Sequence, residues 1–216
     1  MRPPALLPPA RADGPLRCVR ALRRVPHDER LLVADGGGTL LFRGTANWRD
    51  ALAEARVGKR LVADGAGGVH RGFWDLYEAQ VRARALEAVS TGRVHTLAGH
   101  SLGGVFAILC AHDMHRLGVP PPRAIYTYGA PRVGDARFAR ASARFPVRRV
   151  ANAEDVVTRL PPLCHHVGAP LALDFDLGSI VLNHGLQGYE DALAARRAGA
   201  PWWPRWLPAT PLQPRD

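Results

Sequence analysis

The sequence predicts a single α/β domain in which helices cover both faces of a mainly parallel central sheet. Its 216 residues, 47% of them apolar, suit one domain with a sizeable core. Short apolar segments alternate with segments of helical periodicity, which is the order typical of a parallel sheet. Over residues 94–104 an apolar run, a serine between glycines and a helix-like segment follow one another, which indicates a sharp turn from a strand into a helix.

The expected elements follow from apolar spacing and from the glycines and prolines between them. Glycines 36–38 separate two apolar runs and indicate a hairpin. Apolar residues four apart indicate an amphipathic helix over 73–89, which Gly92 ends. In chain order we expect a hairpin over 31–42, a short helix over 48–55, a helix over 73–89, a strand over 93–98, a helix over 102–117, a strand over 124–128, a helix over 135–144, strands over 147–151 and 171–175, and a helix over 188–197.

Proline-rich segments flank the expected domain. Proline and arginine dominate residues 1–17, which we expect to form a disordered lead. The folded domain is expected over 18–200. Residues 201–216 form a tail rich in tryptophan and proline, and we expect it to pack on the core because its prolines prevent a long helix.

Ser101 is the candidate nucleophile. Gly99 and Gly103 stand where a sharp turn leaves no room for side chains. Such a turn lifts the serine hydroxyl above the edge of the sheet. It also points the first backbone N–H groups of the next helix toward the same space, where they can stabilise an oxyanion. The segment therefore predicts nucleophilic attack on an acyl group.

The nucleophile needs two partners. A serine hydroxyl is weak near neutral pH and requires a base, and the base requires a third group that fixes its tautomer. In this kind of sheet the partners follow later strands, first the acid and then the histidine. Asp155 follows the strand expected over 147–151, and His184 follows the last apolar strand region, so these two are the expected acid and base.

Other side chains compete for the two roles. His100 is next to the nucleophile and is expected to face away from the base position. His165 and His166 also come after Asp155, but they leave little room for another strand, so His184 ranks first. The competing carboxylates are expected to point away or to lie on the surface, and they are Glu154, Asp174 and Asp176.

Five segments carry a resemblance to a known family. They are Leu41–Thr45 followed by Trp48 and Asp50, Val69–Phe73, the turn from Gly99 to Gly104, Tyr128–Gly134, and Arg149–Pro162. In this order the set resembles the class 3 lipase family, the α/β-hydrolases that include filamentous-fungal triacylglycerol lipases. The resemblance covers about residues 31–195.

The resemblance implies an α/β-hydrolase fold and agrees with the chemistry of the individual residues. Ser101 matches the family's nucleophile, Asp155 its acid and His184 its base. Thr45 matches the residue whose backbone N–H and hydroxyl form one half of the oxyanion hole, and Leu102 supplies the other N–H.

The resemblance also assigns roles outside the triad. Tyr189 follows the base as the family's pattern suggests, and His166 lies in a segment that is structural in the family. The family's lid corresponds to residues 46–58. Trp48 is the main apolar side chain there, so this stretch would gain little from contact with a lipid interface.

Composition limits the partners. The net charge of +10 comes from 28 arginines and one lysine, which indicates a coding bias more than selection for a cationic function. The arginines are scattered, so no specific nucleic-acid partner is expected, whereas an anionic membrane surface fits as a salt-dependent partner. The three cysteines have no metal-ligand spacing, which fits reduced thiols, and neither metal nor organic cofactor is expected. Oligomeric state is left open.

The sequence also bears on location. It contains no run of 18 apolar residues, and prolines interrupt the first residues before a signal sequence could form. We therefore expect a cytoplasmic protein.

Two classes of function follow from these residues. The first is a serine ester hydrolase, a lipase or esterase that cleaves acylglycerols or related lipids through an acyl-enzyme; a phospholipase or an acyltransferase would share its triad. The second is a hydrolase-like scaffold without catalysis that binds anionic lipid or nucleic acid through its arginines. The complete set of triad residues favours the first.

Overall fold

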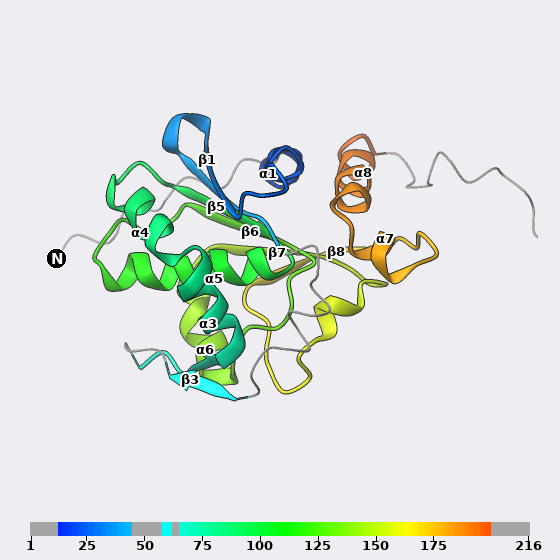
Figure 1. The fold of residues 1–216 in the computed structure, drawn as a ribbon. Helices are drawn as coiled ribbons and strands as arrows, with labels where there is room; N and C mark the ends of the chain where they lie inside the picture. The colour runs from blue at the N-terminus through cyan, green and yellow to red at the C-terminus, as the bar shows by residue number, and fades with distance from the viewer. Residues whose placement is uncertain (1–12, 45–57, 62–64, 200–216) are drawn as a thin grey trace, which may run out of the picture.

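A computed structural model describes residues 13–44, 58–61 and 65–199 of the chain (Figure 1). The helix expected over 48–55, the lid expected over 46–58 apart from its last residue, and the tail over 201–216 lie outside these residues. Among the described residues, no helix combines the length and the apolar character that crossing a membrane requires.

A six-stranded sheet forms the centre of the molecule, in the order β1-β2-β5-β6-β7-β8. β1 runs antiparallel to β2, and every other neighbouring pair is parallel. Its strands are β1 (Leu31–Ala34), β2 (Thr39–Phe42), β5 (Thr96–His100), β6 (Ala124–Tyr128), β7 (Val147–Asn152) and β8 (Ala169–Leu173). A separate antiparallel pair joins β3 (Lys59–Leu61) to β4 (Gly68–His70). The mainly parallel sheet confirms the predicted fold class.

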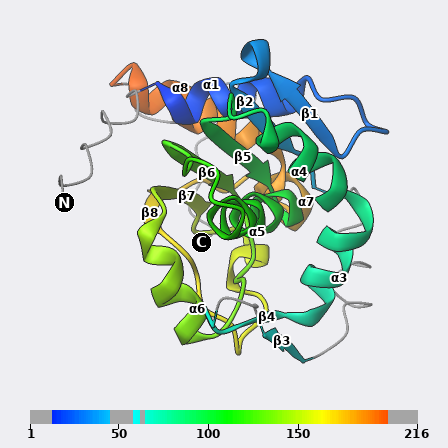
Figure 2. The same ribbon diagram turned by 90° about the vertical axis from the view of Figure 1, so that its left-hand side faces the viewer.

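Helices cover both faces of this sheet (Figures 1 and 2). One face packs against α3 (Arg71–Gln80), α4 (Arg82–Ser90), α5 (Leu102–Arg116) and α6 (Ala136–Ala141). The other packs against α1 (Gly14–Arg23) and α8 (Leu186–Arg197), which lie side by side. α7 (Ile180–His184) precedes α8, and the short 3₁₀ helices η1 (Asp35–Gly37), η2 (Ser142–Arg144) and η3 (Val156–Arg159) lie in connections.

The sheet is apolar on both faces because each face carries its own core. In β2, Leu40 and Phe42 belong to the core beneath α5, whereas Leu41 between them belongs to the core beneath α1 and α8. This alternation is the two-residue period of a strand applied to a sheet buried on both sides. The central β6 is buried along its whole length.

The structure corrects the expected start of the fold. α1 begins at Gly14, so residues 14–17, expected in the disordered lead, are helical. Pro15 stands in the first turn, where a helix needs no amide donor from it. Leu16, Val19 and Leu22 are spaced three apart and buried. The prolines made this segment resemble a disordered lead although their position suits a helix start.

Other boundaries also differ. The helix expected over 73–89 is two helices, because Val81 leaves the helical conformation with φ −137° and ψ −19°. The strand expected over 171–175 ends at Leu173. The amide of Phe175 donates instead to the side chain of Asn152 at 3.0 Å, which ends the pairing.

A buried carboxylate joins α3, α4 and α5. Asp113 of α5 is 3% exposed and accepts hydrogen bonds from Arg82 to both oxygens, at 2.9 and 3.2 Å, and from the hydroxyl of Tyr77 at 3.1 Å. Arg116 pairs with the same carboxylate at 3.2 Å. The break at Val81 places Tyr77 and Arg82 on two differently directed helices that both reach Asp113.

We predict that Asp113→Ala lowers the free energy of unfolding by about 3 kcal/mol or more, because the variant leaves a partly buried guanidinium and a buried hydroxyl without their acceptor. Denaturant unfolding measures this loss. The control is Asp75→Ala, which removes a solvent-exposed pair with Arg71 and should cost about 0.5 kcal/mol or less. Equal losses in the two variants would contradict the prediction.

Candidate active site

The turn between β5 and α5 has the geometry that its glycines predict. Ser101 adopts φ 55° and ψ −128°, a backbone conformation with positive φ that residues other than glycine rarely take. A Cβ at Gly99 would lie 2.1 Å from the carbonyl oxygen of Gly103. A Cβ at Gly103 would lie equally close to the carbonyl oxygen of Phe42 in β2. Only glycines allow the start of α5 to pack this closely on the sheet.

Asp155 and His184 form a buried pair. Nδ1 of His184 lies 2.8 Å from Oδ2 of Asp155, and the two side chains are 4% and 0% exposed. Asp155 follows β7 and precedes η3, and its other oxygen accepts a hydrogen bond from the amide of Val157 at 3.0 Å. These contacts fix the carboxylate and give the imidazole one defined partner. His184 is the last residue of α7, whereas the sequence placed it after a strand.

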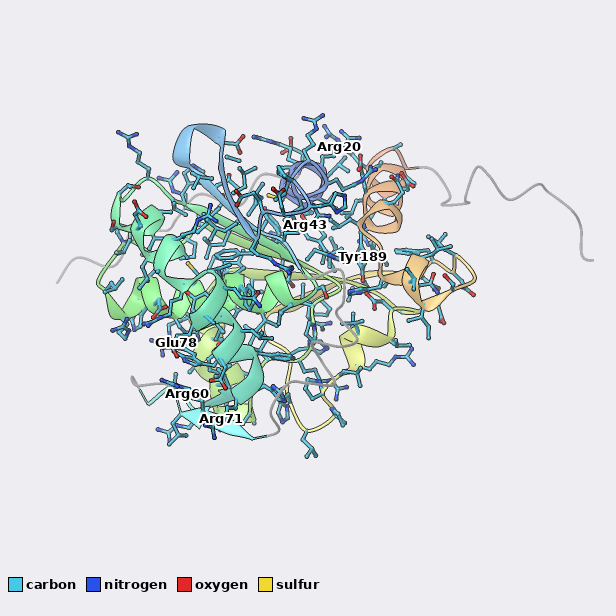
Figure 3. All side chains as sticks on the ribbon, viewed as in Figure 1. Arg20, Arg43, Arg60, Arg71, Glu78 and Tyr189 are labelled. Carbon is cyan, nitrogen blue, oxygen red and sulfur yellow. The ribbon has the colours of Figure 1, made fainter. Side chains whose placement is uncertain are left out.

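Tyr189 completes the environment of the carboxylate. Its hydroxyl donates to Oδ2 of Asp155 at 2.6 Å and accepts from the amide of Asn152 at 3.2 Å. Burial and the neighbouring carboxylate raise the pKa of Tyr189 well above its usual value, so the phenol keeps its proton. Figure 3 shows Tyr189 between α8 and the sheet.

Gly129 lets these groups approach the end of β6. Its φ of +57° suits glycine, and a Cβ there would lie 2.6 Å from Oδ2 of Asp155 and 3.1 Å from Nδ1 of His184. The carbonyl oxygen of the preceding residue, Tyr128, accepts a hydrogen bond from the backbone N–H of Ser101 at 2.9 Å. Ser101, Gly129 and Asp155 therefore follow three adjacent parallel strands at their carboxyl ends, where ligand sites of such sheets lie.

His100 contacts the candidate base. The sequence led us to expect that it faces away, but its ring lies on that of His184 with centroids 4.7 Å apart. Its Nε2 donates to the carbonyl oxygen of His184 at 2.7 Å. Burial, and then the neighbouring His184, lowers the pKa of His100 to about 3, so this ring is neutral near neutral pH.

The competing side chains lie elsewhere. Glu154, Asp174 and Asp176 are exposed. His165 is exposed, and its backbone pairs with Gly134. Burial and the nearby Arg149 lower the pKa of His166 to about 4, and His166 hydrogen-bonds the backbone of Thr158. Of the histidines after Asp155, His184 is the one that the described contacts bring to the carboxylate.

The structure describes one of the two residues expected to form the oxyanion hole. Leu102 is the first residue of α5 and is buried, so its backbone N–H belongs to the first turn of that helix. Thr45 lies outside the described residues. The residue before it, Gly44, borders Ser101, since a Cβ there would lie 2.9 Å from Cβ of Ser101. Among the described residues, no group of three or more histidine, cysteine or acidic side chains could hold a metal ion.

Residues 39–165 match the family described as lipase (class 3). The chain belongs to the class 3 lipase family. A solved relative of this class 3 lipase chain, the lipase from Rhizopus microsporus var. chinensis, is 30% identical, with a TM-score of 0.56 over 66% of this chain and 55% of that one. Such lipase structures support the α/β-hydrolase fold.

Two curated relatives carry different lipase names. A lipase from Rhizomucor miehei is 32% identical over 166 residues, which cover 70% of this class 3 lipase chain and 46% of the relative. Phospholipase A1 EG1, chloroplastic/mitochondrial, from Oryza sativa subsp. indica is 35% identical over 116 residues, which cover 44% and 27%. The chain thus spans about half the length of the first of these relatives and about a quarter of the second.

Two features of this candidate site lay beyond the sequence reasoning. The contact of His100 with His184 crosses 84 positions, and nothing in the sequence pairs those rings. The hydrogen bond from Tyr189 to Asp155 was not predicted, since the family pattern indicated only that Tyr189 follows the base. A helical period from residue 186 does place Tyr189 on the buried face of α8, where a phenol needs a polar partner.

We predict that His100→Gln makes the stability of this protein less sensitive to acid. Because the pKa of folded His100 lies below that of a free histidine, about 6.5, the unfolded chain binds the extra proton between about pH 6.5 and 3. Wild-type stability should therefore fall as pH decreases through this range. Denaturant unfolding at about pH 4.5 and 7 measures the slope.

In His100→Gln the slope should decrease but persist, since burial also lowers the pKa of His166. His165→Gln, which changes an exposed ring, serves as the control and should keep the wild-type slope. An unchanged slope in His100→Gln would show that the low pKa of His100 does not contribute.

Proposed function

We propose that the chain hydrolyses carboxylic esters of lipids, with Ser101 as nucleophile, His184 as general base and acid, and Asp155 as the residue that orients His184. The observation that supports this most directly is the buried 2.8 Å contact between Asp155 and His184, beside a serine in the strained turn of a nucleophile elbow. Family membership points to the same chemistry.

Each step uses a group whose placement favours it. Ser101 attacks the ester carbonyl while His184 takes its proton, and Asp155 stabilises the resulting imidazolium. The backbone N–H groups of Leu102 and Thr45 stabilise the oxyanion. His184 then protonates the leaving alcohol and activates the water that cleaves the acyl-enzyme. The hydrogen bonds from Tyr189 and the amide of Val157 keep the carboxylate of Asp155 oriented toward His184.

The substrates proposed are acylglycerols and glycerophospholipids. The names of the relatives include both a lipase and a phospholipase A1, and both reactions need the same triad. An anionic membrane surface remains the proposed site of action, because a net charge of +10 favours such a surface in a salt-dependent way. The cytoplasmic location stays a prediction from the sequence, since the rice relative is named for chloroplasts and mitochondria.

We predict that Ser101→Ala lowers hydrolysis of p-nitrophenyl butyrate by about 10⁴-fold or more and abolishes labelling by a fluorophosphonate. Peptide mapping of the labelled wild-type protein should place the probe on Ser101. The control is Ser90→Ala, which changes an exposed hydroxyl at the end of α4 and should keep both activities. Wild-type rates in Ser101→Ala would refute the proposal.

The oxyanion assignment has its own test. Thr45→Ala removes the proposed hydroxyl donor and should lower kcat for the same ester by about 10²-fold with little change in KM, because the hydrogen bond strengthens in the transition state. Thr91→Ala, which removes a hydroxyl at the carboxyl end of α4, is the control. A change confined to KM would assign Thr45 to substrate binding instead.

A further inference from the structure

Arg149 is a cation for which the described residues provide no ion-pair partner. It lies in β7 and is partly buried, and its Nε is buried with no hydrogen-bond acceptor. Burial, and then Arg132, lower the pKa of Arg149, whereas Tyr189 raises it. The guanidinium is therefore held in the fold without the anion that usually accompanies it.

A second unsatisfied polar group lies beside it. Thr127 of β6 is paired in register with Arg149 across the parallel strands, so the two side chains point to the same face. Thr127 is fully buried, and its hydroxyl has no hydrogen-bond partner among the residues that the structure describes. A Cβ at Gly104 would lie 3.1 Å from Cβ of Thr127, so this face is the one against the first turn of α5. That turn begins directly after Ser101.

The surroundings add donors and positive charge. Arg132 follows β6 and donates to the carbonyl oxygen of Pro162 at 3.1 Å, which holds it near the segment after Asp155. His166 lies within the electrostatic reach of both Arg149 and Arg132 and hydrogen-bonds the backbone of Thr158 in η3. η3 begins directly after Asp155. The cluster of Arg149, Arg132, Thr127 and His166 thus adjoins the proposed triad on the α5 face of the sheet.

An arginine can stay near a core without a ligand when its stem covers apolar surface and its nitrogens reach water. Arg149 differs, because its Nε is buried beside a hydroxyl that also lacks a partner. Leaving such donors unpaired costs folding free energy that an apolar residue in the strand would avoid. An anion with several acceptor oxygens would satisfy both groups at once.

We propose that Arg149, with Arg132 and Thr127, binds the anionic group of a lipid beside the proposed nucleophile, and that this group is the phosphate of a glycerophospholipid substrate. A phosphodiester offers the multiple acceptor oxygens that an arginine fork matches, and a neutral acylglycerol offers no anion there. The inference rests on the proposed ester hydrolysis. A released fatty acid has a carboxylate of similar chemistry, so product binding is the other source of an anion.

The experiment compares two lipid substrates with the same acyl chains, phosphatidylcholine and diacylglycerol, in mixed micelles. In Arg149→Gln, kcat/KM for phosphatidylcholine should fall by about 10-fold or more, whereas that for diacylglycerol changes by less than about 3-fold. Thr127→Val, which keeps the shape and removes the hydroxyl, should lower the phospholipid rate in the same direction. The control is Arg148→Gln on the same strand, whose side chain is exposed and points to the opposite face.

Inhibition by added oleate separates the two sources. Selective loss of phospholipid hydrolysis with unchanged oleate inhibition supports the phosphate, whereas weaker oleate inhibition with an unchanged ratio of the two lipid rates assigns the anion site to the product and overturns the proposed occupant. Unchanged ratios and unchanged inhibition overturn the site altogether.

Hydrolysis of p-nitrophenyl butyrate reports separately on the proposed ester hydrolysis. If this activity survives in Arg149→Gln and depends on Ser101, a failed anion site leaves the proposed function standing. If Arg149→Gln does not fold, Arg149→Lys takes its place. It keeps the charge but loses the fork, and it should also lower the rate with phosphatidylcholine relative to that with diacylglycerol.

Discussion

The close packing of backbone against backbone at the β5–α5 turn is the constraint on which the site depends. A Cβ at Gly99 would collide with the carbonyl of Gly103, and a Cβ at Gly103 would collide with the carbonyl of Phe42 in β2, so three elements meet with no side chain between them. This contact over-determines the backbone on either side of Ser101, which is how a non-glycine residue can remain in a left-handed conformation. The strain is the means by which the serine is presented at the sheet edge, next to the first N–H groups of α5.

The same edge of the sheet also holds a fully buried carboxylate. Burying such a polar group without hydrogen bonds would cost folding free energy. Asp155 instead receives hydrogen bonds from Tyr189 and from the amide of Val157, in addition to the contact with His184. Gly129 provides the space for this cluster because it has no Cβ. The pair formed by Asp155 and His184 is thus organised by backbone at the ends of β6 and β7, and α8 contributes one phenol from the opposite face.

The sequence predicted what depends on local pattern. The turn at Ser101, the extent of β6 and the pairing of β1 with β2 follow from spacing and glycine content, and the structure has them where they were expected. The sequence did not predict the start of α1. Prolines occur both in the first turn of a helix and in disordered segments, and only the structure shows that Leu16 is buried.

The positions of single side chains at the site were less predictable. His100 was expected to point away from the candidate base. The alternation of side chains along a strand could not reveal its contact with His184 of α7, which lies 84 positions later in the chain. Contacts of this kind depend on how distant elements dock, which a local pattern does not contain.

The arginines show why composition cannot assign function residue by residue. As a set they fit a coding bias, but individually the structure separates them. Arg20 and Arg23 of α1 form ion pairs with Glu190 of α8, and Figure 3 shows Arg20 where these two helices lie side by side. Arg82 neutralises a buried acid within the core formed by α3, α4 and α5.

Arg149 has neither role, since burial removes its Nε from water and no described carboxylate replaces that solvation. A bias in codon usage explains why an arginine is available at such a position, but it does not offset the cost of burying one unpaired. That cost is what distinguishes Arg149 from the exposed Arg148 beside it in the same strand.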